Sequence, residues 1–510
     1  MGASQVDETE LKFDVGTETV FPNLTAAEGV VSVEQPEDLR LEAVYYDTPH
    51  HDLARHGMTL RRRSGGTDDG WTLKLPAGPD TRTEVRVPLG TADDDGLPEE
   101  LRARARGVTR NRPLSPVVAL STSRREYAVC DADGGVLARV TDDSVRARLL
   151  ATEGPEQTWR EWEVELDQGP APVLDALADV LLEAGATPAA VASKLARALG
   201  DTLAAEADRA TRGTLPDGTA GALWATHLAE QVDRLHEQDA RLRAELPESV
   251  HRLRIAARTM RSALTTFRPV LDRRVTDPVR EELRWLGQEL APARDAQVLR
   301  EHLIELIDAE PPELVMGPVA TRIDDELGAD HESGLAKAAE AINGERYLRL
   351  LDALDDLLAD PPLRPGAATP ARTVARRLLT RDLQRLRQAV GDIADASGQA
   401  ERDAAHHEAR KKAKRLRYAA EAAGPTLGKR ARALGKDAKR VQKILGTHQD
   451  AVTARVRLRE LGVQAHLAGE NSFTYGRLHA LEQARAERAE AEFEEVWATF
   501  CRKQVRRWVR

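Results

Sequence analysis

The spacing of apolar and polar residues changes along this chain and divides it into two regions. Up to about residue 166, short runs alternate apolar with polar side chains between Gly, Pro and Asp, as in WTLKLP (71–76) and REWEVEL (160–166). This alternation predicts the strands of an antiparallel sheet or barrel. From about Leu223 to the end, apolar residues recur at helical spacing, which predicts an all-α region.

Helical segments and a polar linker separate the two regions. VLDALADVLLEAG (173–185) and VASKLARALG (191–200) have helical spacing, and a stretch rich in Thr, Gly, Asp and Pro follows them. We therefore predict an α+β protein of two domains, an antiparallel barrel with flanking helices followed by duplicated helical bundles. The expected boundaries are 1–200 for the first domain, 201–219 for the linker and 220–510 for the second, with repeats at about 220–360 and 370–510.

The helical half repeats itself at an offset of 156 residues, where HRLRIAARTMRSALTTF (251–267) superposes on HEARKKAKRLRYAAEAA (407–423). Spacings of 3, 4 and 7 put the basic residues of each segment on one helix face, opposite an apolar stripe. The matched pairs are His251 and His407, Arg254 and Arg410, Arg258 and Lys414, Arg261 and Arg417, Arg280 and Lys436, and Arg284 and Arg440. Two basic stripes in matching register favour an anion site over solvated helix faces.

The net charge of −10 conceals an asymmetry along the chain. Residues 1–200 carry 35 acidic and 22 basic residues, whereas residues 407–443 hold 13 basic residues against 3 acidic ones. A basic cluster inside an acidic protein indicates a local anion site. Only Cys130 and Cys501 occur, no apolar run reaches the length of a membrane helix, and the acidic N-terminus lacks a signal-peptide pattern. We therefore expect a cytoplasmic protein.

The first strand, ETELKFDV (8–15), raises the question of what its charged side faces. Glu8, Glu10 and Lys12 share one face of a strand, opposite Leu11 and Phe13. Other strands also carry charge on one parity, namely those with Arg61 and Arg63, Lys74, Arg82 with Glu84 and Arg86, and Glu161 with Glu163 and Glu165. In a barrel these side chains line the lumen, whereas in a sandwich they form a polar outer face. Carboxylates with Arg and Lys suit a divalent metal and condensed phosphate.

The N-terminal motifs resemble the CYTH superfamily, the triphosphate tunnel metalloenzymes. Glu8-Thr9-Glu10-Leu11-Lys12 matches the ExExK signature, and YYDTP (45–49), LRRR (60–63), LKLP (73–76), TEVRVPL (83–89), TDD (141–143), EWEVEL (161–166) and SKLARAL (193–199) follow in family order. The resemblance implies a tunnel-like barrel of about eight strands that binds triphosphate with Mg²⁺ or Mn²⁺. One departure is Arg139, which stands where many relatives carry an acidic residue.

The resemblance also implies roles for individual residues. Glu8, Glu10 and Lys12 form the implied catalytic set. The implied metal ligands are Glu8, Glu10, Asp143, Glu161, Glu163 and Glu165. The implied phosphate contacts are Arg61, Arg63, Lys74, Arg86, Arg125 and Lys194.

The helical half resembles the CHAD domain, a histidine-rich module often fused after CYTH, through HxxRxxxRxxR, HEARKKAKRLRY and LGTHQDAV (445–452). This resemblance implies inorganic polyphosphate as the ligand and polyphosphate granules as a candidate place of association. The predicted polyphosphate contacts are His251, Arg254, Arg258, Arg261, Arg280, Arg284, His407, Arg410, Lys411, Lys414, Arg417, Lys436, Lys439, Arg440 and Lys443. We expect His251, His407 and His448 to hydrogen-bond phosphate or neighbouring side chains and not to hold a metal, because no carboxylate cluster accompanies them in the sequence.

Two functions from different classes remain open. In the first, the barrel is a metal-dependent triphosphatase and the helical domain binds polyphosphate. In the second, the barrel is degenerate and the protein is a polyphosphate-binding adaptor, which Arg139 favours. A cyclase acting on ATP and hydrolysis of thiamine triphosphate are further alternatives. Nucleic acid is a competing polyanion, but the basic helices offer few aromatic residues for base stacking.

Overall fold

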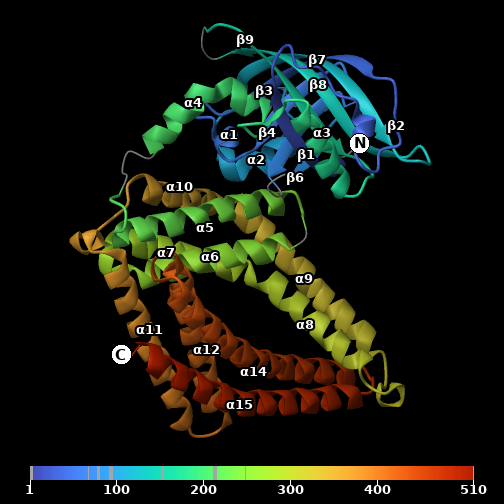
Figure 1. The fold of residues 1–510 in the computed structure, drawn as a ribbon. Coiled ribbons are helices and arrows are strands. Elements are labelled where there is room, and N and C mark those ends of the chain that lie inside the picture. The colour runs from blue at the N-terminus through green and yellow to red at the C-terminus, as the bar shows by residue number, and fades with distance from the viewer. Residues whose placement is uncertain are drawn as a thin grey trace. The chain divides into compact units, whose positions relative to one another are not determined.

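The protein folds into two compact units, Met1–Arg212 with Asp239–Leu246 and Gly213–Gln238 with Pro247–Arg510 (Figure 1). The computed structural model describes residues 4–66, 68–76, 81–90, 96–150, 154–210, 215–246 and 248–508, without the side chains of residues 201, 204–210 and 504–508. Residues 201–210, predicted to be linker, are helical and form the part of α4 (Lys194–Ala210) that follows a break in the helical backbone at Gly200.

The first unit is built on an antiparallel barrel. The strands are β1 (Ser4–Val15), β2 (Ser32–Val33), β3 (Glu37–Asp47), β4 (Thr59–Ser64), β5 (Gly70–Pro76), β6 (Thr81–Val87), β7 (Ser115–Cys130), β8 (Val136–Leu149), β9 (Gln157–Leu166) and β10 (Thr187–Pro188). Among the described residues, eight of them pair in the order β1-β6-β5-β4-β3-β7-β8-β9, and β9 pairs back with β1 to close the barrel. The predicted barrel is therefore confirmed and the sandwich is excluded.

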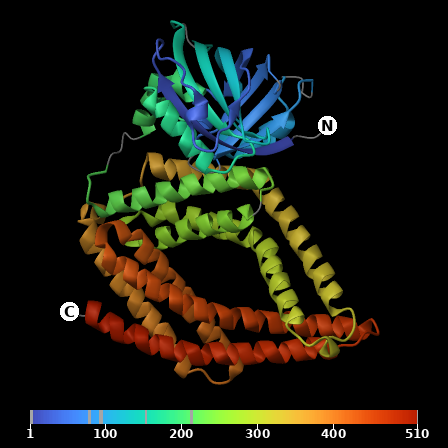
Figure 2. The same cartoon turned by 45° about the vertical axis from the view of Figure 1, so that its right-hand side comes forward.

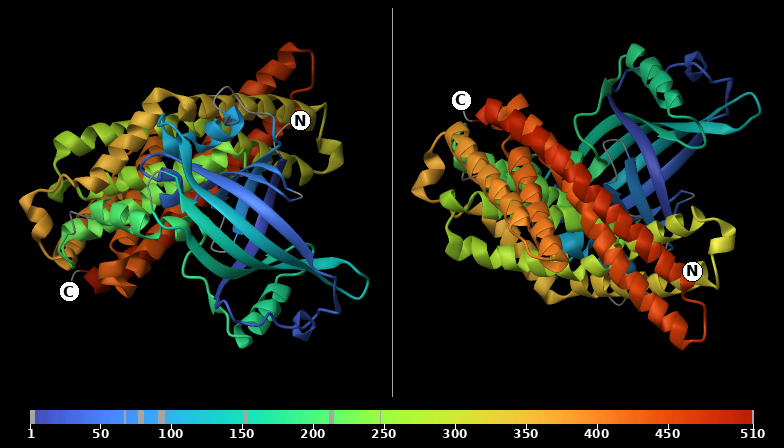
Figure 3. Two further views of the ribbon diagram at one scale, coloured as in Figure 1. Left: turned by 90° about the horizontal axis from the view of Figure 1, so that it is seen from above. Right: turned by 90° about the horizontal axis from the view of Figure 1, so that it is seen from below.

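Apolar side chains point outwards from the barrel, where helices cover them. The helices of this unit are α1 (Asp52–Arg55), α2 (Glu99–Thr109), α3 (Pro172–Glu183) and α4, together with a 3₁₀ turn at Leu24–Ala26. Phe13 of β1 and Trp162 of β9 are buried in one cluster with Leu177 and Leu181 of α3. Because side chains alternate along a strand, fixing Phe13 outwards turns Glu10 and Lys12 inwards. Figure 3 shows the curved strands of the barrel from two further directions.

The second unit is all helical. Its helices are α5 (Ala220–Arg243), α6 (Ser249–Thr266), α7 (Arg273–Glu289), α8 (Ala291–Asp308), α9 (Val319–Asn343), α10 (Glu345–Ala359), α11 (Ala371–Ala394), α12 (Gln399–Ala422), α13 (Gly424–Leu427), α14 (Lys429–Leu467) and α15 (Phe473–Trp508), with 3₁₀ turns at Arg268–Val270, Pro312–Leu314 and Pro365–Ala368. The end of α5 and the residues that follow it, Asp239–Leu246, belong to the first unit, where Ala240 and Ala244 pack with Leu60 and Leu101.

The sequence repeat appears as two sets of helices. The repeated segments form α6 and α12, and each is followed by a helical segment that turns back: α7 with α8 in the first set and the single long α14 in the second. A new helix, α8, begins beside Pro292, whereas α14 continues for 39 residues. Helices α11, α12, α14 and α15 bury one core that includes Leu383, Leu416 and Phe493. Figure 2 shows α14 and α15 running side by side.

Candidate functional sites

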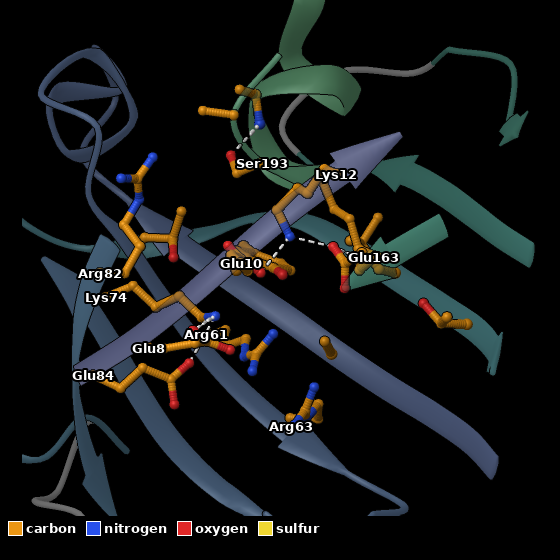
Figure 4. A pocket seen from close by; sticks show the side chains of 18 of the residues that line it. Glu8, Glu10, Lys12, Arg61, Arg63, Lys74, Arg82, Glu84, Glu163 and Ser193 are labelled. Atoms are coloured by element: carbon orange, nitrogen blue, oxygen red, sulfur yellow. Dashed lines mark hydrogen bonds and ion pairs between the residues drawn. The ribbon is translucent and has the colours of Figure 1, made fainter. Parts of the chain in front are cut away.

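A charged cavity of about 150 Å³ lies inside the barrel (Figure 4). Its charged lining comes from the inward parity of six strands and from the start of α4. These residues are Glu8, Glu10 and Lys12 of β1, Arg61 and Arg63 of β4, Lys74 of β5, Arg82, Glu84 and Arg86 of β6, Arg124 of β7, Glu163 and Glu165 of β9, and Lys194, with Asp68 from the loop after β4. The charged face of ETELKFDV thus faces a lumen and not bulk water.

One side of the lumen gathers carboxylates around a lysine. Asp143, Glu161 and Glu163 are buried, and a carboxylate oxygen of each lies within 4.8 Å of the others. The ammonium of Lys194 contacts all three, at 3.0 Å from Asp143, 2.6 Å from Glu161 and 2.8 Å from Glu163. A cationic group therefore already sits at the focus of three oxygen ligands, the donor set that hard divalent cations prefer. This cluster fits a divalent metal ion.

A second set of lysine contacts continues along β1. Lys12 donates to Glu10 at 2.7 Å and also to Glu163, while Lys74 contacts Glu84 at 2.7 Å and also Glu8. Burial alone would raise the pKa of Glu163, but Lys12, Lys194 and Arg124 hold it well below its usual value. Glu163 is therefore ionised and available as a ligand at neutral pH.

Not every lumenal carboxyl group is compensated by a nearby cation. Burial, and then the negative charge of Glu8, raise the pKa of Glu165 to about 8. On β9, Glu165 pairs with Glu10 of β1, so three carboxyl groups crowd this part of the wall. Crowded carboxyl groups indicate a place that gains from an added cation.

The opposite side of the lumen carries excess positive charge. Burial, followed by the charges of Arg61 and Arg124, lowers the pKa of Arg63 to about 9. Asp68 forms ion pairs with both Arg61 and Arg63, at 3.7 Å for Arg61. An anionic side chain thus occupies part of the space in which converging guanidinium groups would bind a phosphate.

Arg125, predicted as a phosphate contact, lies outside the lumen, and this prediction was wrong. Its side chain is 53% exposed and donates to Asp38 at 2.9 Å. The neighbouring Arg124 has the inward parity and makes a two-point contact with Asp143, at 2.9 and 2.7 Å, while reaching Glu163 at 3.1 Å. Strand alternation from the lumenal Thr122 identifies Arg124 as the inward residue.

This difference predicts contrasting effects of two adjacent substitutions. Arg124→Lys removes the fork that holds Asp143, so we expect the affinity of the carboxylate cluster for Mn²⁺ to fall about ten- to hundredfold. Arg125→Lys, on the same strand but facing outwards, should change this affinity less than twofold. Calorimetric titration of both purified variants with Mn²⁺ measures this, and equal losses in the two variants would contradict the assignment of Arg124.

Glu84 and Arg82 line the lumen but had no predicted role beyond their shared strand face. Glu84 is 1% exposed and binds Lys74, and Arg82 and Arg86 flank it on β6. The alternation in TRTEVRV placed all three on one face, but only Arg86 was predicted as a phosphate contact. Arg139 is 42% exposed and pairs with Glu126 and Asp167. It is therefore not a member of the Asp143–Glu161–Glu163 cluster.

In the helical unit, the two basic stripes meet. Arg258 of α6 donates to the Tyr418 hydroxyl of α12 at 2.8 Å and lies 5.7 Å from its ring centre, while Arg417 stacks at 4.3 Å. Burial lowers the pKa of Lys414 to about 6, assisted by Arg258, Arg410, Arg254 and Arg261. Cationic groups from both repeats thus converge on Lys414.

Other predicted contacts surround this centre less closely. Arg280 and Arg284 bind Glu281 at 2.6 and 3.3 Å, yet both lower the pKa of Arg261, after burial and Arg258. His251 has a lowered pKa from burial and nearby arginines, whereas His407 contacts Gln449 at 2.8 Å. The remaining predicted contacts are exposed: Lys411, which pairs with Glu408, and Lys436, Lys439, Arg440 and Lys443 on α14.

The expectation that no carboxylate cluster accompanies the histidines was wrong for His448. Its ring is 1% exposed, and its Nε2 lies 2.9 Å from Glu490 and 3.4 Å from Asp403. Both partners are far from His448 in sequence, on α15 and α12, so no local motif indicated them. His448 is therefore part of a separate buried cluster.

Comparison with known proteins identifies the family. Residues 7–198 match the CYTH domain and residues 226–459 match the CHAD domain. An uncharacterized protein of Mycobacterium tuberculosis, found in strains CDC 1551 and H37Rv, is 41% identical over 502 residues, or 96% of this chain and 95% of that protein. The chain belongs to the CYTH–CHAD proteins, in which a CYTH domain is followed by a CHAD domain. The CYTH family is metal-dependent and includes triphosphatases and cyclases.

Two solved structures are similar to part of the chain. PptA from Streptomyces chartreusis is 24% identical with a TM-score of 0.47, covering 55% of this chain and 99% of that chain. The CHAD domain from the plant Ricinus communis is 23% identical with a TM-score of 0.45, covering 57% of this chain and 95% of that chain. Within the residues that the structure describes, no helix is both long and apolar enough to cross a membrane.

Proposed function

We propose that the barrel hydrolyses inorganic triphosphate or a related triphosphate with the aid of a divalent metal ion. The observation that carries this proposal is the division of the lumen: Asp143, Glu161 and Glu163 cluster on one side, and Arg61 and Arg63 converge on the other. A linear triphosphate needs both, because metal and guanidinium groups each offset part of its charge.

The chain's own residues provide binding, orientation and exclusion of bulk water. Arg61, Arg63 and Lys74 would bind phosphate oxygens, with Asp68 displaced as the substrate enters. Mg²⁺ or Mn²⁺ held by the clustered carboxylates would supply Lewis acidity and an activated water. Lys194 and Arg124 keep Asp143 and Glu163 ionised and oriented in this arrangement.

Phosphate release from tripolyphosphate, ATP and thiamine triphosphate tests this proposal on the full chain. We expect tripolyphosphate to be hydrolysed with Mg²⁺ or Mn²⁺ and not with a chelator. Absence of phosphate release from all three substrates with either metal, together with retained polyphosphate binding, would favour the adaptor with a degenerate tunnel. Release of pyrophosphate from ATP would instead favour a cyclase.

We further propose that the stripes on α6 and α12 bind inorganic polyphosphate. The support is their convergence: Arg258 contacts Tyr418 across the repeats, and several guanidinium groups depress the pKa of Lys414. A bound polyanion would offset the repulsion between these closely spaced positive charges.

The lowered pKa of Lys414 predicts that polyphosphate binding depends on pH. With a pKa of about 6, Lys414 is neutral at pH 8, and a bound polyanion stabilises its charged form, so binding takes up a proton. Affinity should therefore rise as the pH falls from about 8 to about 6, by up to about tenfold per pH unit. Binding of long-chain polyphosphate at constant ionic strength measures this.

Two variants separate the effect of Lys414 from that of the other groups near the basic stripes, such as His251. Lys414→Arg carries a permanent charge and should flatten the pH profile. Lys412→Arg, on the same helix and paired with Glu408, should keep the wild-type profile. An unchanged pH slope in Lys414→Arg would show that another group takes up the proton.

A further inference from the structure

A buried histidine pair lies where α12, α14 and α15 pack together, separate from the basic stripes. His406 of α12 is 4% exposed and His448 of α14 is 1% exposed, with ring centres 4.6 Å apart. Glu490 of α15 completes a group in which one ligand atom from each residue lies within 4.8 Å of the others. Neither residue on the stripes, His251 or His407, belongs to this group, and Glu490 lies beyond the residues matched by the CHAD domain.

The distances in this cluster suit a tetrahedral metal site. Nε2 of His448 lies 2.9 Å from Oε1 of Glu490 and 3.4 Å from Oδ1 of Asp403. Ligands bound at about 2.0–2.1 Å in a tetrahedron stand about 3.3 Å apart, so both separations are near that value. Asp403 contacts His448 but stands outside the group of ligand atoms that all lie within 4.8 Å of one another, so it flanks the site.

The surroundings of His406 prepare its free nitrogen for coordination. Its Nδ1 donates to the carbonyl oxygen of Arg402 at 2.9 Å, which fixes the tautomer with the lone pair on Nε2. Phe493 packs edge-on against this ring at 5.9 Å. A metal-binding histidine typically has such a backbone acceptor on its other nitrogen.

His448 makes its polar contacts through one nitrogen. Its Nδ1 is buried and has no hydrogen-bond partner among the described residues, so Nε2 alone faces Glu490 and Asp403. The side chains of Glu490 and Asp403 are 29% and 23% exposed. The two imidazoles are therefore interior, while the carboxylates lie nearer to solvent, where an ion could enter.

We propose that His406, His448 and Glu490 form a site for Zn²⁺ or a similar divalent transition-metal ion, with Asp403 beside it. Two imidazoles and one carboxylate offer the mixed nitrogen and oxygen set that Zn²⁺ takes. The oxygen-only cluster in the barrel suits Mg²⁺ or Mn²⁺ instead. Ligands from three helices would tie α12 to α14 and α15 just before the basic stripe begins at His407.

The test uses the full chain after treatment with a chelator and in excess Mg²⁺, which occupies oxygen-only sites. Zn²⁺ titration should give one equivalent bound and a rise in thermal midpoint, because an ion that binds only the folded state stabilises it. Co²⁺ in the same site should give the visible bands of tetrahedral coordination, which Zn²⁺ should abolish. Absence of both the thermal shift and the Co²⁺ bands in the wild-type chain would overturn the proposal.

Matched variants assign the site to these residues. Glu490→Gln keeps an oxygen that can accept from His448 but loses the charge, and it should weaken Zn²⁺ binding at least tenfold, as should His406→Gln. His466→Gln, which replaces an exposed histidine on α14, should bind Zn²⁺ like the wild type. Wild-type Zn²⁺ affinity in both Glu490→Gln and His406→Gln would show that the cluster is an ion-pair network only. None of these readouts depends on triphosphate hydrolysis.

Discussion

Replacing Glu10 by Gln is expected to lower metal-dependent phosphate release from tripolyphosphate by about a hundredfold or more. Burial alone would raise the pKa of Glu10, but Lys12 and Lys74 hold it below its usual value, so this carboxylate is charged at neutral pH. The substitution removes that charge with almost no change of shape. The site would lose affinity for metal, and the balance between the lumenal cations and anions would shift.

Phosphate release measured over a range of Mn²⁺ concentrations distinguishes a loss of metal binding from a loss of folding. A variant that has lost a ligand should recover part of its rate at high Mn²⁺ and keep the thermal midpoint within a few degrees. We expect Glu8→Gln to show the same partial recovery at high Mn²⁺ and the same small change in thermal midpoint as Glu10→Gln. The matched control is Asp7→Asn, since Asp7 is a neighbouring carboxylate on β1 with the outward parity. A rate within twofold of wild type for both Glu8→Gln and Glu10→Gln at limiting metal would exclude a metal role for this strand.

The strict alternation along the strands was sufficient to predict an antiparallel sheet with one charged face, and the resemblance to the CYTH superfamily then favoured a barrel over a sandwich. In ETELKFDV, the buried Phe13 fixes which face is outside, and the charged residues of the same strand then have to face inwards. The same rule could have distinguished Arg124 from Arg125. It failed there because Arg124 and Arg125 are adjacent, so one of them points inwards whichever face of the strand lines the lumen. Only the lumenal position of Thr122 shows that the inward residue is Arg124.

The repeat was equally visible, because α6 and α12 carry the same spacing of basic and apolar residues. The cluster at His448 was not, since its members come from three helices whose pairing depends on tertiary packing. Asp403 and His406 are local to each other, but His448 and Glu490 are brought to them by the core around Phe493. Asp68 was missed for a related reason: it lies in a loop, where no alternation of apolar and polar residues indicates which side chains point into the lumen.

Replacing both Arg254 and Arg258 by Ala should weaken polyphosphate binding about ten- to hundredfold at low salt. Arg258 supports the contact between the repeats through Tyr418, and Arg254 contributes to the field that depresses the pKa of Lys414. The pair Arg410→Ala and Lys414→Ala should have the same effect from the second repeat. Equal effects from both sides are expected if one chain of phosphates lies against both stripes.

The salt dependence of binding reports the number of contacts directly. Counterion release from a single-stranded polyanion gives a slope of log K against log salt of about −0.7 per contact, so each double variant should flatten the slope by roughly one to one and a half. Arg372→Ala with Arg376→Ala removes two exposed charges from α11, and Glu340→Ala removes an acidic residue from α9; both should leave the slope unchanged. Wild-type affinity and slope in both stripe variants would show that the repeated basic faces are solvated helix surfaces.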